Sequence, residues 1–218
     1  MKIIIRSDHV HIEGYVNAVE RLSKPLTERH PITSKLVTFM ERVKAGTFKK
    51  ALQSAPDVRI LLNHKEERDL GGIKDGNLKL EEDSIGLRAE ADIFDPEVIK
   101  DAKAGKLVGW SFGFYPLNHR ETSEDGMPIR ELSEIDLREV SILNKNHTPA
   151  YDGTLVCVRD LSGEKMLIAD SFISEDIEIR EEADSESQPA QEEPETPKEV
   201  SSEYYARYKT MIALMKEA

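Results

Sequence analysis

Three polar residues of this sequence stand in local contexts that could support catalysis: His64, Ser111 and Glu139. His64 follows the apolar run 58–62, at a point where a strand is expected to end and a polar loop to begin. A rigid strand would hold the imidazole near solvent, where it could accept a proton and return it near neutral pH. A surface histidine at a strand end is the simpler interpretation of this residue alone.

Ser111 lies among aromatic residues and glycines in the segment 109–114, Gly-Trp-Ser-Phe-Gly-Phe. The glycines would let another backbone, such as that of a bound peptide, approach closely. The segment also matches the G-x-S-x-G pattern of hydrolases, which requires a strand, a sharp turn and then a helix. The residues after Ser111 are β-formers followed by Pro116, which is a poor start for a helix. A serine in an ordinary strand therefore remains an interpretation.

Glu139 and Ser141 would share one face of a strand over 132–143. Their neighbours in this segment are mainly apolar, and a buried carboxylate needs a partner because an unpaired buried charge is costly. An imidazole could be that partner. Arg138 or Arg130 could also fill the role in a purely structural ion pair.

The elements that would position these residues are mostly strands. Segments that are β-rich or alternate in polarity cover 9–19, 57–62, 86–94, 107–115, 129–143 and 154–158. Two helices are expected: one over 34–43 that continues with 48–52, and one capped by Asp95 that ends at Gly105. Glycine-containing turns at 74–77 and 124–126 separate strands. This pattern indicates a mostly β domain with a few helices, built as a barrel.

The composition excludes several classes of protein. The chain has 218 residues, a formal charge of −12 and a single cysteine, Cys157, so neither an internal disulfide nor a cysteine-based zinc site can form. His9 and His11 share a strand face without an apparent third ligand, and no metal site is expected. No apolar run suits a membrane span or a secretory signal, which predicts a cytosolic protein. The negative charge argues against a general nucleic-acid binder.

The C-terminal part of the chain has a different composition. Residues 174–203 contain twelve acidic and two basic residues, three prolines and few apolar ones. Such a segment cannot bury enough surface to offset the entropy of ordering, which predicts a flexible acidic linker. Residues 204–218 would form a short amphipathic helix with Tyr204, Tyr208 and Met211 on its apolar face. That helix either folds back on the parent domain or docks on a partner.

Several segments, in order, resemble the prohead maturation proteases of tailed bacteriophages, serine peptidases that cleave capsid and scaffold proteins during head assembly. The resemblance extends over residues 10–157. The matching pieces are Glu13-Gly14-Tyr15 with Ala18-Val19, Glu41-Arg42-Val43 with Gly46 and Phe48, Leu62-Asn63-His64 with Leu70-Gly71, Gly86-Leu87 with Glu90-Ala91, Ser111-Phe112-Gly113-Phe114, Leu137 with Glu139-Val140-Ser141-Ile142, and Thr148-Pro149-Ala150-Tyr151.

The resemblance implies a fold of the herpesvirus assemblin type over residues 1–173, a closed or nearly closed β-barrel flanked by helices. The composition of the C-terminal part predicts that a disordered acidic tail follows this fold. The resemblance also implies that Ser111 is the nucleophile and His64 the general base, and that Glu139 orients the His64 ring. Assemblin-type enzymes use a second histidine in the third role, which makes His147 the alternative. Lys65 departs from the usual family pattern, in which an aspartate commonly follows the histidine.

By the same resemblance the protein is a serine endopeptidase without a cofactor. The major capsid protein and the scaffold segment would be its substrates, and it would also cleave itself. It would act in the host cytoplasm inside the immature prohead, without binding nucleic acid or a membrane, and a homo-oligomer is compatible with this function. Two alternatives stay open: a non-catalytic capsid assembly or scaffolding protein with the protease fold, and a small serine esterase.

Overall fold

The computed structural model describes residues 1–29, 34–145, 156–159, 165–168, 172–173 and 177–181. The helix expected over 204–218 lies outside these residues, as does most of the linker expected over 174–203. The proposed domain boundaries therefore stay predictions. Within the described residues the chain forms strands and two short helices, which confirms a mostly β protein with few helices.

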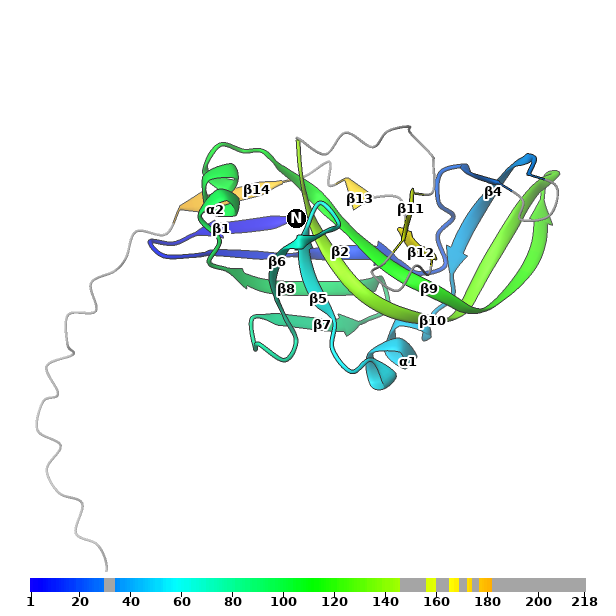
Figure 1. Cartoon of the computed structure of the whole chain (residues 1–218), viewed down its shortest axis with the longest axis horizontal. Coiled ribbons are helices and arrows are strands. Elements are labelled where there is room, and N and C mark those ends of the chain that lie inside the picture. Colours follow the sequence, from blue (N-terminus) through cyan, green and yellow to red (C-terminus); the bar gives the residue numbers. More distant parts are fainter. Residues whose placement is uncertain (30–33, 146–155, 160–164, 169–171, 174–176, 182–218) are drawn as a thin grey trace, which may run out of the picture. The chain divides into compact units, whose positions relative to one another are not determined.

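The first sheet has five strands in the order β14-β1-β2-β8-β7 (Figure 1). Its pairs are antiparallel except for β1 and β14, which run parallel. Buried positions alternate with less buried ones along β8, as expected for a sheet with one face on the core. The strands are β1 (Lys2–Ile5), β2 (Val10–Ala18), β7 (Leu78–Glu82), β8 (Gly86–Ile93) and β14 (Glu178–Glu181).

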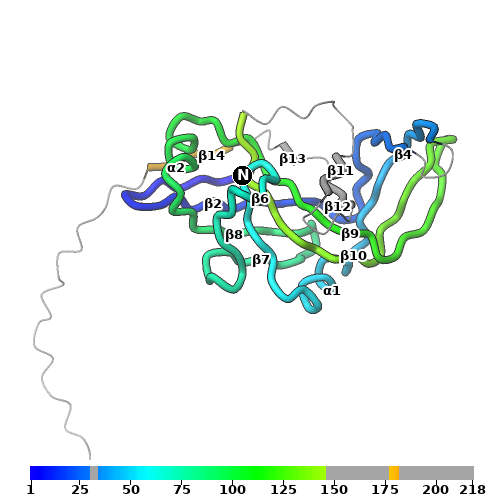
Figure 2. The backbone as a smooth tube through the Cα atoms, in the orientation of Figure 1, coloured from blue at the N-terminus to red at the C-terminus, as the bar shows by residue number. Residues whose placement is uncertain are grey.

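The second sheet is built on a long hairpin of β9 (Leu107–Glu124) and β10 (Met127–Asn144), which run side by side in Figure 1. β4 (Leu36–Val43) and β5 (Arg59–Leu62) pair in parallel with two separate stretches of β10. Figure 2 traces this hairpin from the end near β6 to the end near β4. The remaining strands of this sheet are β3 (Leu26–Arg29), β6 (Lys65–Gly72), β11 (Val156–Arg159), β12 (Lys165–Ile168) and β13 (Phe172–Ile173).

Two eight-residue helices, α1 (Thr47–Ser54) and α2 (Pro96–Lys103), pack against the sheets. The Asp95 side chain accepts hydrogen bonds from the amides of Glu97 and Val98, so the predicted start of α2 is confirmed. Phe48 of α1 packs edge-on against Phe112 and belongs to the same buried core as residues of both sheets. Among the described residues, neither helix has the length and apolar character to cross a membrane.

The prediction of a helix over 34–43 is wrong, because most of this segment forms strand β4. Its apolar residues fit a helical spacing as well as a strand, but the buried side chains are Phe39, Glu41 and Val43, at the period of two of a strand. Sequence patterning missed Glu41 as a buried position because it carries a charge. Arg130 of β10 supplies the partner, at 2.7 Å from the Glu41 carboxylate. Burial raises the pKa of Glu41, and the nearby Arg130 charge opposes that rise.

The expected closed barrel is also not observed, because the described strands form two separate hydrogen-bonded sheets. One edge strand of the first sheet is β14, which pairs with β1. At the other edge, Glu82 of β7 accepts hydrogen bonds from the amides of Gly46 and Lys49 at the start of α1. Among the described residues, neither of these edge strands forms the ladder to the second sheet that closure requires.

Gly86 is the position at which a side chain would disturb this fold most directly. A Cβ there would lie 2.0 Å from the carbonyl oxygen of Asn17 and 2.8 Å from the Cα of Ala18, both backbone atoms of β2. We expect Gly86→Ala to lower the free energy of unfolding by about 3 kcal/mol, because β2 and β8 must separate locally. Denaturant unfolding of the two proteins measures this difference.

Gly76→Ala is the matched control for Gly86→Ala. Gly76 has a φ of +78° but no atom within 4 Å of the added Cβ, so the substitution introduces backbone strain without a clash. Its expected cost is about 1 kcal/mol. Equal losses in the two variants would contradict the steric explanation of Gly86.

Candidate active site

Three adjacent strands bring the candidate residues into one region of the second sheet. β10 lies between β5 and β9, and Ser141 of β10 is paired with Leu61 of β5 and with Ser111 of β9. Directly opposed residues of neighbouring strands present their side chains on the same face, so Ser111 and Ser141 share a face. Glu139 precedes Ser141 by two positions, which puts its side chain on that face as well.

His64 and Glu139 are joined by a buried hydrogen bond. The Nδ1 atom of His64 lies 2.7 Å from Oε1 of Glu139, and the two residues are 8% and 3% exposed. A carboxylate accepts hydrogen bonds, so Nδ1 carries the proton in this contact. The carboxylate therefore selects one tautomer of the ring, as the acid does in serine-protease triads. The imidazole is the partner that the buried carboxylate of Glu139 was expected to need.

The backbone at His64 forms a tight left-handed turn. Leu62 pairs with Lys65 across the end of the β5–β6 hairpin, and the two residues between them, Asn63 and His64, have φ values of 55° and 59°. Two positive φ values are the signature of a type I′ turn, whose second position is most often glycine. Histidine at that position is strained by about 1 kcal/mol. The turn holds the imidazole at a fixed corner of the hairpin.

Hydrogen bonds of two asparagine side chains connect this turn to β10. Asn63 donates from Nδ2 to Oδ1 of Asn144 over 2.9 Å, and its own Oδ1 accepts the backbone amide of Asn144 at 3.0 Å. Asn144 in turn donates to the buried carboxylate of Asp101 over 2.8 Å. The sequence patterns predict no contact for any of these three residues. Asn63 at the first position of a two-residue turn was the one local signal that could have indicated the turn.

Ser141 is a fourth polar residue of the region. Its hydroxyl donates to Oε2 of Glu139 over 2.6 Å and accepts the backbone amide of His64 at 3.1 Å. The side chain is completely buried. The strand period of two predicts that Ser141 shares a face with Glu139, but it predicts no contact for the hydroxyl.

The surroundings of Glu139 and Ser111 differ from the alternative interpretations of these residues. Arg130 pairs with Glu41, and Arg138 lies 3.5 Å from Asp136, so each of these arginines has a carboxylate partner other than Glu139. Ser111 lies inside the continuous strand β9, so the strand–turn–helix context of a nucleophile elbow is not present there. His147 lies outside the described residues.

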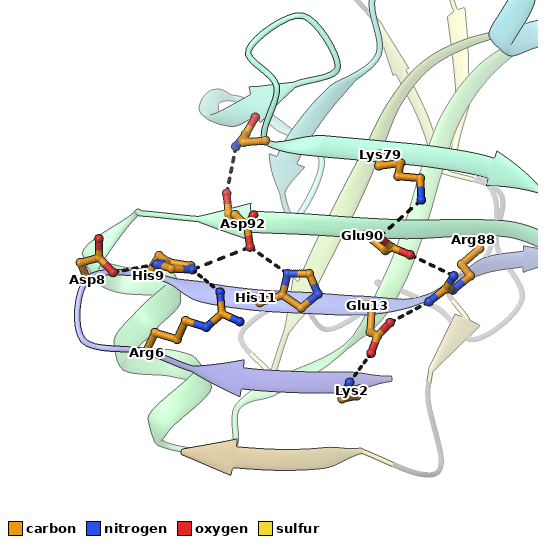
Figure 3. Close-up of polar contacts among 11 residues, drawn as sticks. Lys2, Arg6, Asp8, His9, His11, Glu13, Lys79, Arg88, Glu90 and Asp92 are labelled. Carbon is orange, nitrogen blue, oxygen red and sulfur yellow. Dashed lines mark hydrogen bonds and ion pairs between the residues drawn. The ribbon is translucent and has the colours of Figure 1, made fainter. Parts of the chain in front are cut away.

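His9 and His11 belong to a separate polar cluster on the first sheet, shown in Figure 3. Arg6 donates to Nε2 of His9 over 3.2 Å, and Nδ1 of His9 therefore donates to Asp8 at 2.7 Å. Nδ1 of His11 lies 2.8 Å from Asp92. The cluster ties β2 to β8, and no group of metal-ligating side chains with the right arrangement occurs among the described residues.

Farther along β2, Glu13 lies between Lys2 and Arg88, as Figure 3 also shows. The hydrogen bond from Lys2 holds the pKa of Glu13 below its ordinary value, and a second bond from Arg88 adds to this effect. These cross-strand ion pairs join β1, β2 and β8 and stabilise the sheet modestly.

The site thus contains a histidine with one nitrogen committed to a buried carboxylate, and a serine on the strand beside that carboxylate. An imidazole held in this way can serve as a base through its other nitrogen, Nε2. A serine hydroxyl becomes a useful nucleophile only when such a base accepts its proton. The arrangement is therefore suited to acyl transfer.

Comparison with known protein families gives an independent result. A family model described as caudovirus prohead serine protease matches residues 2–168, a range that includes His64, Ser111 and Glu139. No match was found among curated proteins or among solved structures.

Proposed function

The chain belongs to the caudovirus prohead serine protease family, and on that basis we propose that it is an active serine endopeptidase of capsid maturation. Its substrates are the major capsid protein and the scaffold segment, and it also cleaves itself. Ser111 is the nucleophile, His64 the general base, and Glu139 the acid that orients His64. The protein acts inside the immature prohead in the host.

The observation that carries this proposal is the buried contact of 2.7 Å between Nδ1 of His64 and Glu139, one strand away from Ser111. A buried carboxylate next to the ring favours the imidazolium that forms when the base takes up a proton. The same contact leaves Nε2 as the nitrogen that exchanges protons with a serine.

In the first half of the reaction, Oγ of Ser111 forms a bond to the carbonyl carbon of the scissile peptide while its proton passes to Nε2 of His64. The C–N bond then breaks, and the proton on Nε2 passes to the leaving amine. In the second half, a water molecule gives a proton to Nε2 and attacks the acyl-enzyme. Release of the carboxylic acid returns the proton to Oγ of Ser111.

The choice of Ser111 over Ser141 as nucleophile follows from the hydrogen bonds of Ser141. The proton of the Ser141 hydroxyl is directed at the Glu139 carboxylate, and its oxygen accepts the amide of His64. A hydroxyl that donates to the acid is not positioned to give its proton to the imidazole. Ser111 is the other serine on this face, directly across the strand pair.

The proposal is tested by producing the full chain together with its cognate capsid protein and mapping new chain ends by mass spectrometry. Defined cuts in the capsid protein are expected with the wild type and none with His64→Ala. His119→Ala is the matched control, since His119 is an exposed histidine on β9, and it is expected to leave the cuts unchanged.

Two results would contradict the proposal. Identical cuts with wild type and His64→Ala would remove His64 from the mechanism. An intact capsid protein in the presence of the folded wild type, inside assembled proheads, would favour the non-catalytic assembly protein.

A further inference from the structure

Ser141 makes two hydrogen bonds that link the proposed acid and the proposed base. The hydroxyl proton points to Oε2 of Glu139 at 2.6 Å, and the hydroxyl oxygen accepts the backbone amide of His64 at 3.1 Å. Because the residue is completely buried on a central strand, the hydroxyl has little freedom to choose other partners. One side chain therefore contacts both members of the pair.

The first of these bonds fixes the orientation of the carboxylate. Glu139 uses Oε1 for Nδ1 of His64 and Oε2 for Ser141, so each of its oxygens has a donor in a fixed direction. A glutamate side chain has more rotatable bonds than an aspartate, so this second contact restricts its position further. The bond to Ser141 is charge-assisted and short, which makes it one of the stronger kind.

The second bond fixes the backbone of the base. His64 occupies the second position of the left-handed turn, with a φ of 59°, where a residue with a Cβ is strained. Its amide is directed across to β10 and ends on Ser141. This contact stabilises the turn in the conformation that places the imidazole against Glu139.

We infer that Ser141 is a positioning residue of the peptidase: its hydroxyl aligns the Glu139 carboxylate and anchors the His64 turn, without contacting the substrate. The inference rests on the proposed function of His64 and Glu139. It adds a fourth residue whose loss impairs proton transfer while leaving the nucleophile in place.

The test compares Ser141→Ala with Ser141→Thr in the full chain, on a peptide that spans a mapped cut. Ser141→Ala is expected to lower kcat by about 10- to 100-fold with little change in KM, because misaligned proton transfer slows chemistry more than binding. The acidic limb of the pH profile is expected to move to higher pH. Without the Ser141 hydroxyl, the Glu139 carboxylate carries more of its negative charge toward His64 and stabilises the protonated imidazole more strongly. Ser141→Thr keeps the hydroxyl, and the acidic limb of its pH profile is expected to stay where it is in the wild type.

Ser133→Ala is the matched control. Ser133 is a serine of the same strand whose hydroxyl donates to the carbonyl of Asn118 over 3.3 Å, away from the site. Its removal is expected to change neither kcat nor the pH profile. Rates are expressed per active site, counted by covalent labelling with a fluorophosphonate, so that a loss of folded protein is separated from a loss of rate.

The outcomes distinguish this inference from the proposed function. A wild type that neither cleaves the peptide nor takes up the label contradicts the proposed function itself. An active wild type with an equally active Ser141→Ala variant, or with a lower rate but an unchanged acidic limb, overturns the positioning role alone. If Ser141→Ala fails to fold, Ser141→Cys replaces it, because the thiol is of similar size and is only a weak donor. The acidic limb of its pH profile must then be shifted, whereas that of Ser141→Thr must not.

Discussion

Replacing Ser111 with alanine is expected to lower kcat for peptide hydrolysis on the order of a million-fold, the cost of removing a catalytic serine in a well-studied protease. Alanine has no hydroxyl to form the acyl-enzyme, and the hydroxyl of Ser141 is already directed at Glu139. The reaction would then depend on direct attack by water. The initial rate on a peptide spanning a mapped cut measures the loss, and circular dichroism checks that the variant is folded.

Covalent labelling gives the same experiment a second readout. A fluorophosphonate is expected to modify wild type once, and peptide mapping should place the label on Ser111. Ser111→Ala should take up none, whereas Ser133→Ala, which lacks a serine elsewhere in the same hairpin, should be labelled fully. A label on Ser141, or undiminished cleavage by Ser111→Ala, would contradict the assignment of the nucleophile.

Glu139→Gln is expected to lower kcat by about ten-thousand-fold, as the corresponding change of acid to amide does in a serine protease. The amide removes the negative charge that stabilises the imidazolium of His64. Its nitrogen can also face Nδ1 of His64 and favour the wrong tautomer. Single-turnover rates measured on the same peptide would isolate this effect on acylation from product release.

Glu134→Gln is the control for this substitution, because Glu134 is an exposed glutamate on the same strand. It is expected to leave kcat unchanged. The competing assignment gives the third role to His147, so His147→Ala belongs in the same series. Full activity in Glu139→Gln together with loss in His147→Ala would transfer the role to the histidine.

The sequence predicted those strands of the fold whose signals are local. Alternating polarity and β-branched residues marked β2, β5, β8, β9 and β10, and the pair Asp95 and Pro96 marked the start of α2. The segment 34–43 is ambiguous in sequence, because a short apolar run fits both the helical and the strand period. Its strand character depends on pairing with β10, which is distant in sequence, and with β3, which the sequence does not predict as a strand.

The contact between His64 and Glu139 could be anticipated only in part. Glu139 was recognisable as a carboxylate on an apolar strand, but periodicity could not choose between an imidazole and an arginine as its partner. That choice depends on the parallel pairing of β5 with β10, which brings residues 75 positions apart together. The sequence predicted the strand face of Ser141 but not its two hydrogen bonds, because the bond to the amide of His64 also depends on this pairing.

The left-handed turn at His64 bears on which residues evolution can place at this position. The residue that adopts its φ of 59° most easily is glycine, and the imidazole stays there at the expense of a more relaxed hairpin. Selection for stability alone would favour glycine at this position, and the proposed role of His64 as general base would oppose that exchange. A related chain with glycine at this position would lack the proposed general base, and we expect such a chain to have lost the proposed peptidase activity.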